Sequence, residues 1–238
     1  MPDIFYPSKN DNNKIYIAVL AKGRDIEAKD VTVEYRRKKE DEFFKYINLD
    51  INKSIFMHQV HQVNIEKIDE NNINKFGGRE KLVENTDALI TNLKNVPLVV
   101  QTADCAPVII YCNKTKSIAA VHSSWKGTRD KIVPKTIELM IKEYNAEPSK
   151  MYVYIAPYIA LNNYEVGEEV AVYFKNKTMI NNRWHFDNGL EIRDQIINLG
   201  VLKDNIEISS LNTYDKEFYS YRRDGVQAGR MLTVGVIL

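Results

Sequence analysis

Three side chains in this sequence have the chemistry to hold a metal ion. Cys105 lies in the run Thr-Ala-Asp-Cys-Ala-Pro-Val, between apolar stretches typical of buried strands. His61 and His122 each lie at or near the end of a short apolar run, and the chain has only 2 cysteines and 4 histidines. One thiolate and two imidazoles suit zinc, and also copper, and they leave a position open for catalysis. The sequence therefore predicts one metal bound by His61, Cys105 and His122.

Asp104 stands next to the thiol at a strand end, where a carboxylate is costly to bury without a partner. We expect Asp104 to orient an imidazole or to move protons, with Cys105 and His122 as the other catalytic groups. The same atoms would also serve a different chemistry, since a Cys105 thiolate beside His122 or His61 is a nucleophile with its base. The spacing matches no zinc finger, so a metal ligand and a nucleophile both remain open.

Basic residues near two glycine-containing turns are candidates for binding an anion. Arg222, Arg223 and Arg230 lie close together near the C-terminus and could clamp a phosphate or a carboxylate by bidentate bonds. An ordinary turn with salt-bridged arginines explains the same pattern. Lys126 lies at the start of a predicted helix, where backbone N–H groups favour anions, although Thr128 would also serve there as a simple N-cap. Arg222, Arg230 and Lys126 are the phosphate-binding candidates.

The bulk composition excludes several classes of protein. With 33 basic and 32 acidic residues the net charge is +1, which argues against a nucleic-acid binder. The sequence has no stretch of 18 apolar residues, so no membrane span is expected, and the N-terminal stretch 1–6 is too acidic and short for a signal peptide. Two cysteines are too few for a secreted disulfide framework. We therefore expect a cytoplasmic protein, either a monomer or a homodimer.

Apolar periodicity predicts more short strands than helices, with most helices in the second half of the chain. Such a mixture is typical of an α+β or α/β domain with mixed sheets, and no glycine-rich phosphate loop follows any strand. His58 and His61 are three apart in a predicted strand and would face opposite sides, so His58 is expected to be structural or at the rim. The predicted strands are 14–20, 31–35, 55–61, 63–68, 87–91, 98–101, an antiparallel pair 107–111 with 117–122, 151–155, 206–211 and 231–238; the predicted helices are 36–48, 127–144, 166–174 and 191–199.

Six motifs occur in an order that is similar to one known family. Together they resemble the YfiH-like, laccase-domain family, also called multicopper polyphenol oxidase proteins, from about residue 55 to the C-terminus. The motifs are Gln-Val-His at 59–61, Thr-Asp-Ala-Leu-Ile-Thr at 86–91, Thr-Ala-Asp-Cys-Ala-Pro-Val at 102–108, Ala-Ala-Val-His-Ser-Ser-Trp-Lys-Gly-Thr at 119–128, Tyr-Glu-Val-Gly at 164–167, and Tyr-Ser-Tyr-Arg-Arg-Asp-Gly at 219–225 with Gly-Arg at 229–230.

The resemblance implies one α+β domain with mixed β-sheets flanked by helices, spanning 1–238, and a metal site at His61, Cys105 and His122. It also implies zinc-dependent phosphorolysis of purine nucleosides, including methylthioadenosine, and deamination of adenosine. The expected partners are small molecules, a purine nucleoside and phosphate. Members also carry the names polyphenol oxidase and peptidoglycan editing factor. A copper polyphenol oxidase and a cysteine hydrolase acting on an amide of a cell-wall precursor therefore remain alternatives, although four histidines are too few for a multicopper cluster.

The sequence departs from the family pattern near the proposed ligands. Gln62 replaces a glycine after His61, Ser124 replaces a glycine after His122, and Lys126 replaces an arginine and so lacks its bidentate fork. Asn212 stands where the family has a cysteine. These departures leave the three ligands in place, and we expect them to affect substrate range and rate.

Overall fold

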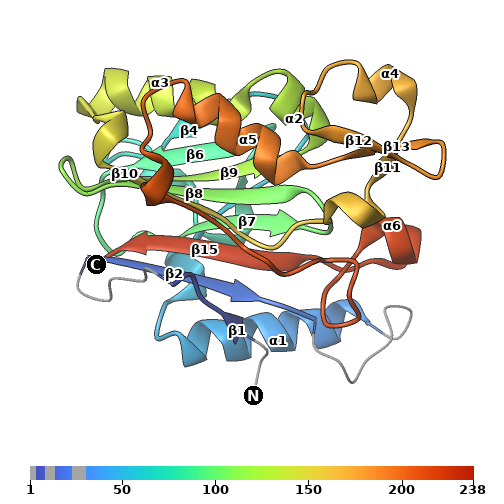
Figure 1. Cartoon of the computed structure of the whole chain (residues 1–238). Helices are drawn as coiled ribbons and strands as arrows, with labels where there is room; N and C mark the ends of the chain where they lie inside the picture. Colours follow the sequence, from blue (N-terminus) through green and yellow to red (C-terminus); the bar gives the residue numbers. More distant parts are fainter. Residues whose placement is uncertain (1–3, 9–13, 23–30) are drawn as a thin grey trace.

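The computed structural model describes residues 4–8, 14–22 and 31–238, so residues 1–3 of the N-terminal stretch discussed above lie outside the described part. Helix α1 (Val33–Tyr46), two six-stranded sheets, and helices α3 (Ile132–Tyr144) and α5 (Asn188–Ile197) form successive layers. Figure 1 shows α1 on one side of the sheets and α3 and α5 on the other. The predicted α+β class, with mixed sheets flanked by helices, is confirmed.

The first sheet, sheet A, contains both parallel and antiparallel pairs. Strand β3 pairs in parallel with β7 and β5, whereas β15 pairs antiparallel with β2 on one side and β7 on the other. The last strand in chain order therefore lies in the middle of the sheet. The strand order is β1 (Ile4–Phe5), β2 (Ile15–Leu20), β15 (Met231–Ile237), β7 (Leu98–Thr102), β3 (Ile55–Met57) and β5 (Gly78–Val83).

The second sheet, sheet B, contains the predicted antiparallel pair. Its strands β8 and β9 pair from Ala106 with Ser123 to Cys112 with Ser117, which confirms the prediction. The two edge strands, β14 and β4, pair in parallel with their neighbours. The strand order is β14 (Ile206–Ile208), β10 (Met151–Ile155), β8 (Ala106–Cys112), β9 (Ser117–Ser123), β6 (Ala88–Thr91) and β4 (Ile65–Lys67).

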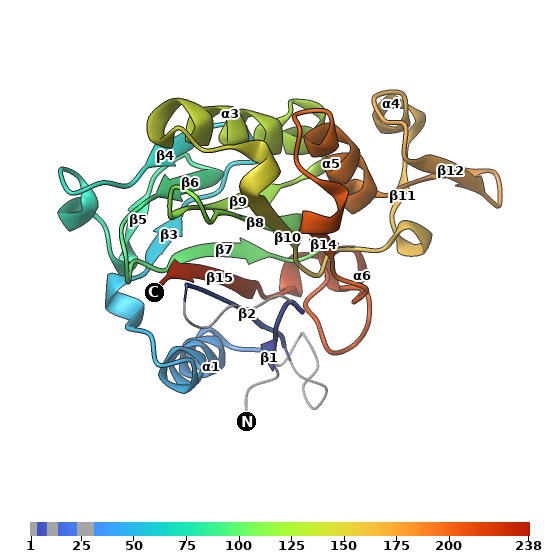
Figure 2. The same ribbon diagram turned by 60° about the vertical axis from the view of Figure 1, so that its left-hand side comes forward.

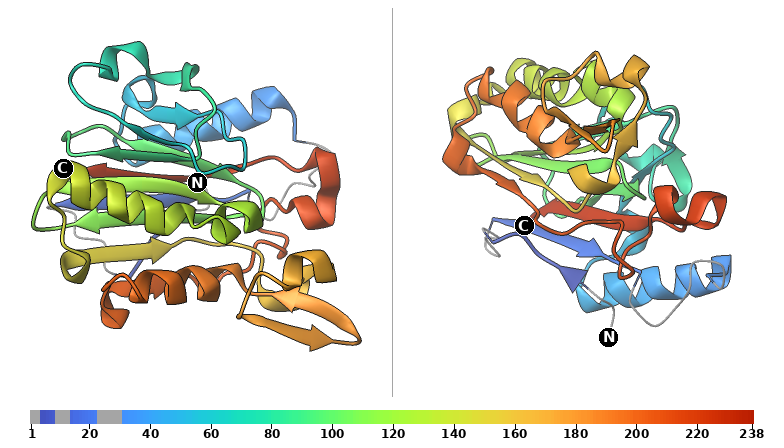
Figure 3. Two further views of the ribbon diagram at one scale, coloured as in Figure 1. Left: turned by 90° about the horizontal axis from the view of Figure 1, so that it is seen from above. Right: turned by 45° about the vertical axis from the view of Figure 1, so that its right-hand side comes forward.

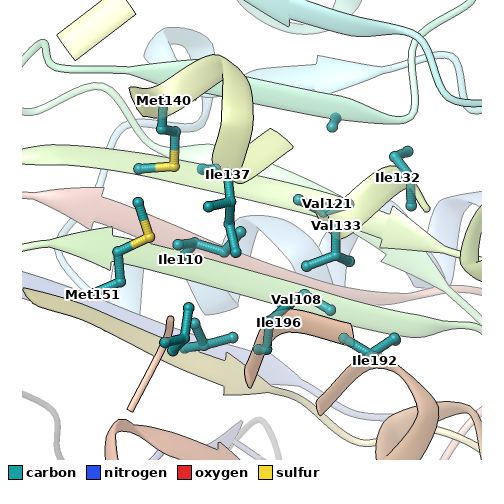
Figure 4. Packing of buried hydrophobic residues seen from close by; sticks show 14 of the residues in the cluster. Val108, Ile110, Val121, Ile132, Val133, Ile137, Met140, Met151, Ile192 and Ile196 are labelled. Atoms are coloured by element: carbon teal, nitrogen blue, oxygen red, sulfur yellow. The ribbon is translucent and has the colours of Figure 1, made fainter. Parts of the chain in front are cut away.

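Side chains of sheet B alternate between two apolar cores, as the period of two along a strand requires. Val108 and Ile110 face α3 and α5 and pack among the residues labelled in Figure 4. Ile109 and Tyr111 point the other way and share a core with residues of sheet A. All of β8 is buried, as expected of a strand between two layers. Seen from above in Figure 3, α3 and α5 run over sheet B.

A third core holds α1 against the outer face of sheet A. Phe43 and Phe44 of the helix pack against Phe56, Val99 and Val234. Burying a phenylalanine side chain stabilises a fold by roughly 2 kcal/mol, so these two rings explain why a helix with a mostly charged sequence docks here. No helix in the described ranges is long and apolar enough to cross a membrane.

The helix predicted over 166–174 is present but shorter, as α4 (Glu168–Ala171), and a small antiparallel sheet flanks it in the chain. The sheet has the order β11 (Glu165–Val166), β13 (Arg183–Phe186) and β12 (Lys177–Ile180), and α4 lies between β11 and β12 in the chain (Figure 2). Asn181 and Asn182 join β12 to β13 with φ angles of 49° and 60°. Asparagine tolerates this left-handed conformation, which is the one a two-residue hairpin loop needs. The Asn181-Asn182 pair is the sequence feature from which this hairpin could have been predicted.

Helix boundaries differ from the prediction for identifiable reasons. The predicted strand over 31–35 is wrong, because Thr32 caps α1 and the helix begins at Val33. The predicted helix over 127–144 is two helices, α2 (Trp125–Arg129) and α3, separated at Lys131 by a φ of 63°. The N-cap of α2 is Ser124, not Thr128. The remaining short helices are α6 (Tyr221–Asp224), η2 (Ile51–Lys53), η3 (Ile73–Lys75), η4 (Pro148–Lys150), η5 (Leu161–Asn163), η6 (Lys203–Asn205) and η7 (Gly225–Gln227).

Candidate metal centre

The three predicted metal ligands come together at one end of the two sheets. One ligand atom from each of His61, Cys105 and His122 lies within 4.8 Å of the other two, and the described ranges hold no other such group of His, Cys, Asp or Glu. The two imidazole rings meet nearly at right angles, with centroids 4.8 Å apart. Three residues far apart in the chain thus form one cluster.

Strand pairing explains this convergence. Cys105 directly precedes β8, and β8 begins with Ala106 paired to Ser123, so the hairpin brings the thiol beside His122 near the end of β9. The predicted strand over 55–61 ends at Met57, and His61 lies in the loop that follows, with a φ of 61°. The predicted convergence of these three residues is confirmed, although the sequence placed His61 in a strand.

A buried carboxylate that the sequence did not single out holds this cluster together. Asp87 accepts hydrogen bonds from the backbone N–H groups of Val60, His61 and Gln62, at 2.9 to 3.2 Å. Its Oδ1 also lies 2.7 Å from Nδ1 of His122. Because Nδ1 of His122 donates to Asp87, Nε2 is the ring atom left to face a metal or the thiol. The motif at 86–91 places this carboxylate at the start of a buried strand, which was the available signal.

Gln59 fixes the same loop to sheet A. Its side-chain amide donates to the carbonyl of Gln101 at 2.8 Å and its side-chain oxygen accepts from the Gln101 N–H at 2.9 Å. These two bonds reproduce the pairing of a neighbouring strand. The exposed His58 has its Nδ1 2.7 Å from a carboxylate oxygen of Glu84 and lies outside the ligand cluster, as predicted.

The surroundings of the cluster favour a charged sulfur. Burial alone would raise the pKa of the Cys105 thiol, but His122 first and then His61 lower it below its usual range. Burial acts to lower the pKa of His122, but Cys105 and Asp87 raise it. Burial also opposes ionisation of Asp87, yet His122 and the N–H groups of Gln62 and Val60 hold its pKa low. A thiolate is both the better metal ligand and the better nucleophile.

The donor set fits a transition metal. Thiolate sulfur and imidazole nitrogen are the ligands preferred by zinc, and a single copper accepts the same set. The described group has three protein ligands, one fewer than a structural zinc site has. Asp87 supplies the carboxylate–histidine contact that typically orients a metal ligand.

Asp104 does not orient an imidazole, contrary to the sequence prediction. Its carboxylate accepts hydrogen bonds from the hydroxyls of Thr213 and Ser220 and from the backbone N–H of Arg222. Its φ is 87°, a conformation that is rare outside glycine and is held here by surrounding contacts, including the bond from the N–H of Ile159 to its carbonyl. The residue that contacts an imidazole is Asp87.

A cavity of about 660 Å³ opens beside the cluster. The three ligands form part of its wall, and Arg222 and Arg230 form another part together with Tyr164 and Tyr221. The Arg222 guanidinium lies over the Tyr164 ring, 5.4 Å from its centroid, and donates to the carbonyl of Glu165. Arg230 donates to the carbonyls of the two residues before it. Two fixed cations thus share one cavity with the ligand cluster.

The other predicted anion-binding residues lie elsewhere. Arg223 donates to the carbonyls of Tyr214, Asp215 and Phe218, so it holds the loop that precedes α6. Lys126 is exposed, lies over the ring of Trp125 and is not in the cavity wall.

Two of the departures from the family pattern, Ser124 and Asn212, have structural roles in this chain. The Ser124 hydroxyl accepts from the N–H of Gly127 and caps α2. Asn212 accepts from the N–H groups of Ala160 and Tyr214 and thereby joins two loops. The backbone N–H of Gln62 donates to Asp87, and its side chain is exposed.

Fold and site together define an α+β protein with a Cys-His-His centre at the wall of a large cavity. The sequence model of the family described as "Multi-copper polyphenol oxidoreductase laccase" matches residues 24–238. The chain belongs to this family. A solved structure of the protein YfiH from Bacillus licheniformis superposes with a TM-score of 0.84 at 21% identity, over 94% of this chain and 93% of that one, and so has the same fold.

Several curated relatives carry enzyme names, including a phosphorylase and a deaminase. A protein of Bacteroides thetaiotaomicron named "Purine nucleoside phosphorylase" is 35% identical over 167 residues, which are 65% of this chain and 62% of that protein. The match thus spans less than two thirds of that relative. "Adenosine deaminase RL5", from an unknown prokaryotic organism, is 28% identical over 200 residues, which are 79% of this chain and 76% of that protein.

Proposed function

We propose that this chain is a metal-dependent purine nucleoside phosphorylase that also cleaves methylthioadenosine and deaminates adenosine. The observation that carries the proposal is the single cavity that joins the Cys105 cluster to Arg222 and Arg230. Phosphorolysis needs a cationic site for phosphate beside the site that holds the nucleoside, and both can be accommodated in about 660 Å³. The names of the relatives support purine nucleosides, including adenosine, as substrates.

His61, Cys105 and His122 would hold the metal, with zinc as our first choice and copper as the second. When bound, such a metal supplies Lewis-acid chemistry and lowers the pKa of a water molecule. Asp87 keeps Nδ1 of His122 protonated and the His61 loop in place. Of the predicted catalytic residues we retain Cys105 and His122, and we assign Asp104 to the turn that carries Arg222.

Arg222 and Arg230 are the proposed phosphate ligands, because guanidinium groups bind phosphate by paired charge-assisted hydrogen bonds. A phosphate held by them would face the ribose carbon at which the glycosidic bond breaks, and its charge would stabilise the positive charge that develops there. The proposed partners are accordingly small molecules, a purine nucleoside and phosphate, and the proposed location is the cytoplasm.

The test uses protein purified without a histidine tag, compared before and after chelation and after addition of zinc or copper. With inosine we expect hypoxanthine and ribose 1-phosphate only when both metal and phosphate are present. With adenosine we expect inosine without phosphate, because water is the nucleophile. Full turnover of both substrates by metal-free protein would contradict the metal requirement.

A second candidate is a cysteine hydrolase that acts on an amide, such as one in a cell-wall precursor. His122 contacts Cys105 on one side and Asp87 on the other. The three residues could therefore act as nucleophile (Cys105), base (His122) and orienting carboxylate (Asp87), as in such enzymes. This candidate predicts amide hydrolysis by metal-free protein and a covalent adduct on Cys105. A multicopper oxidase is less well supported, because the described ranges hold one His/Cys group.

A further inference from the structure

Thr102 is a buried polar side chain in the cavity wall without a partner in the described part of the chain. It ends β7, is 2% exposed, and its hydroxyl forms no hydrogen bond with any described residue. It lines the same cavity as Cys105 and His122. Leaving a buried hydroxyl unpaired destabilises a protein, and such groups are rare. A hydroxyl in this position at a cavity wall is available to pair with a ligand.

We propose that the Thr102 hydroxyl hydrogen-bonds a hydroxyl of the ribose in the nucleoside substrate; this assignment rests on the proposed function. A threonine hydroxyl both donates and accepts, and a ribose hydroxyl does the same, so the two groups are complementary. Ribose is also the part of the substrate that reacts with phosphate. It must therefore lie between the base and the phosphate, within the cavity shared by Thr102, Cys105 and Arg222.

This contact would make the cavity selective. A site built to pair with a substrate hydroxyl discriminates strongly against an analogue that lacks it, since the buried protein group then loses its partner. Nucleosides with an intact ribose would therefore bind better than the deoxy analogue that lacks the contacted hydroxyl. The identity of the base would not affect this contact.

Thr233 provides a matched control. Its hydroxyl is also buried and without a hydrogen bond to the described residues. It lies in β15 directly opposite Val100, and Val100 is two residues from Thr102, so both threonines face the space between the sheets. Thr233 is absent from the cavity wall. The two threonines thus differ in whether they line the cavity, which is what the proposal requires of Thr102.

The test compares Thr102→Val and Thr233→Val with the wild-type protein. Valine keeps the branched shape and suits a strand, and each substitution removes a hydroxyl that pairs with no described residue, so we expect both variants to fold. Binding of inosine to metal-loaded protein is measured by calorimetry in phosphate-free buffer, where phosphorolysis cannot proceed. We expect Thr102→Val to weaken binding about tenfold, the effect of one lost hydrogen bond, and Thr233→Val to leave it unchanged.

Two analogues identify the group that Thr102 contacts. For either 2′-deoxyinosine or 3′-deoxyinosine, the wild-type protein should lose about tenfold in affinity, whereas Thr102→Val should lose nothing further, because the two changes remove one contact. If Thr102→Val binds inosine as tightly as the wild-type protein does, this assignment is overturned but the proposed function is not. The same conclusion follows if the substitution weakens the binding of inosine and of both analogues by the same factor. If the wild-type protein binds no inosine, the proposed function is overturned, and this assignment with it.

Discussion

The carboxylate of Asp104 lies 2.7 Å from the backbone nitrogen of Arg222, a residue 118 positions further along the chain. Asp104 directly precedes the proposed metal ligand Cys105, and Arg222 carries one of the two guanidinium groups in the cavity wall. Thr213 and Ser220 donate to the same carboxylate. One nearly buried side chain therefore connects the loop of the metal ligand to the turn of the proposed phosphate ligand.

Replacing Asp104→Asn should weaken phosphate use while metal content stays the same. The carboxylate of Asp104 accepts from three donors, whereas the asparagine amide would place an N–H donor against one of them. We expect the free energy of unfolding to fall by about 1–3 kcal/mol. We expect the KM for phosphate to rise about tenfold, as for one lost charge-assisted contact, with a smaller effect on adenosine deamination. Steady-state kinetics and elemental analysis measure these effects. Loss of the metal together with both activities would place Asp104 in the metal site instead.

Replacing Asp87→Asn should weaken metal binding. An orienting carboxylate behind a histidine ligand typically contributes 10–100-fold in metal affinity, and we expect a loss of about that size. Competition with a chelator gives the affinity, and urea unfolding gives the accompanying loss of stability, about 2 kcal/mol for a buried charged hydrogen bond. Asp130→Asn is the control, because Asp130 pairs with Arg129 near the surface, where such pairs contribute little. Unchanged metal affinity in Asp87→Asn would argue against His122 as a ligand.

Cys105→Ser separates a metal ligand from a nucleophile. A hydroxyl is a far poorer zinc ligand than a thiolate, so the variant should lose most of its metal during dialysis as well as its activity. Cys112→Ala is the control, since Cys112 is fully buried in the core beneath α3, remote from the ligand cluster, and alanine adds no polar group there. If Cys105→Ser keeps its metal but forms no product, the cysteine hydrolase becomes the better explanation.

Two neighbouring arginines should give opposite results when replaced by alanine. Arg222→Ala should raise the KM for phosphate by more than tenfold, the effect of losing charge-assisted bonds of about 1.5–3 kcal/mol. Arg223→Ala should instead lower the free energy of unfolding by about 2 kcal/mol, because three carbonyls lose their donor. Phosphate kinetics and urea unfolding on both variants check this contrast. An equal loss of stability in the two variants would mean that Arg222 also serves the fold.

The central part of sheet B was predictable, because its strands are buried on both faces and their apolar runs are continuous. The pair β8–β9 and the placement of Cys105 beside His122 follow from that pattern. The break between α2 and α3 was not predictable, since the apolar spacing continues through Lys131 and only the backbone conformation interrupts the helix. Whether residues 1–238 form a single domain stays a prediction.

The cluster of His61, Cys105 and His122 was predictable from the sequence, whereas the residues that support it were less so. Cysteine and histidine are few in this chain, so their positions stand out. Carboxylates are common, and Asp87 and Asp104 both lie beside buried strands, so this shared signal does not select one of them as the partner of His122; that choice depends on which carboxylate the fold brings within 2.7 Å. The same holds for Thr102, whose unpaired hydroxyl is a property of the folded chain.

The position of β15 between β2 and β7 also bears on how this protein is made. During synthesis, all the strands of sheet B leave the ribosome before β15 does, so that sheet can assemble while sheet A still lacks its middle strand. Until β15 arrives, the facing edges of β2 and β7 have unpaired backbone groups that can join strands of other chains. Nascent or truncated chains that stop before Met231 would already contain all three ligands, yet they would lack the strand that pairs with Thr102 and supports the cavity wall. We expect such chains to aggregate rather than to bind metal.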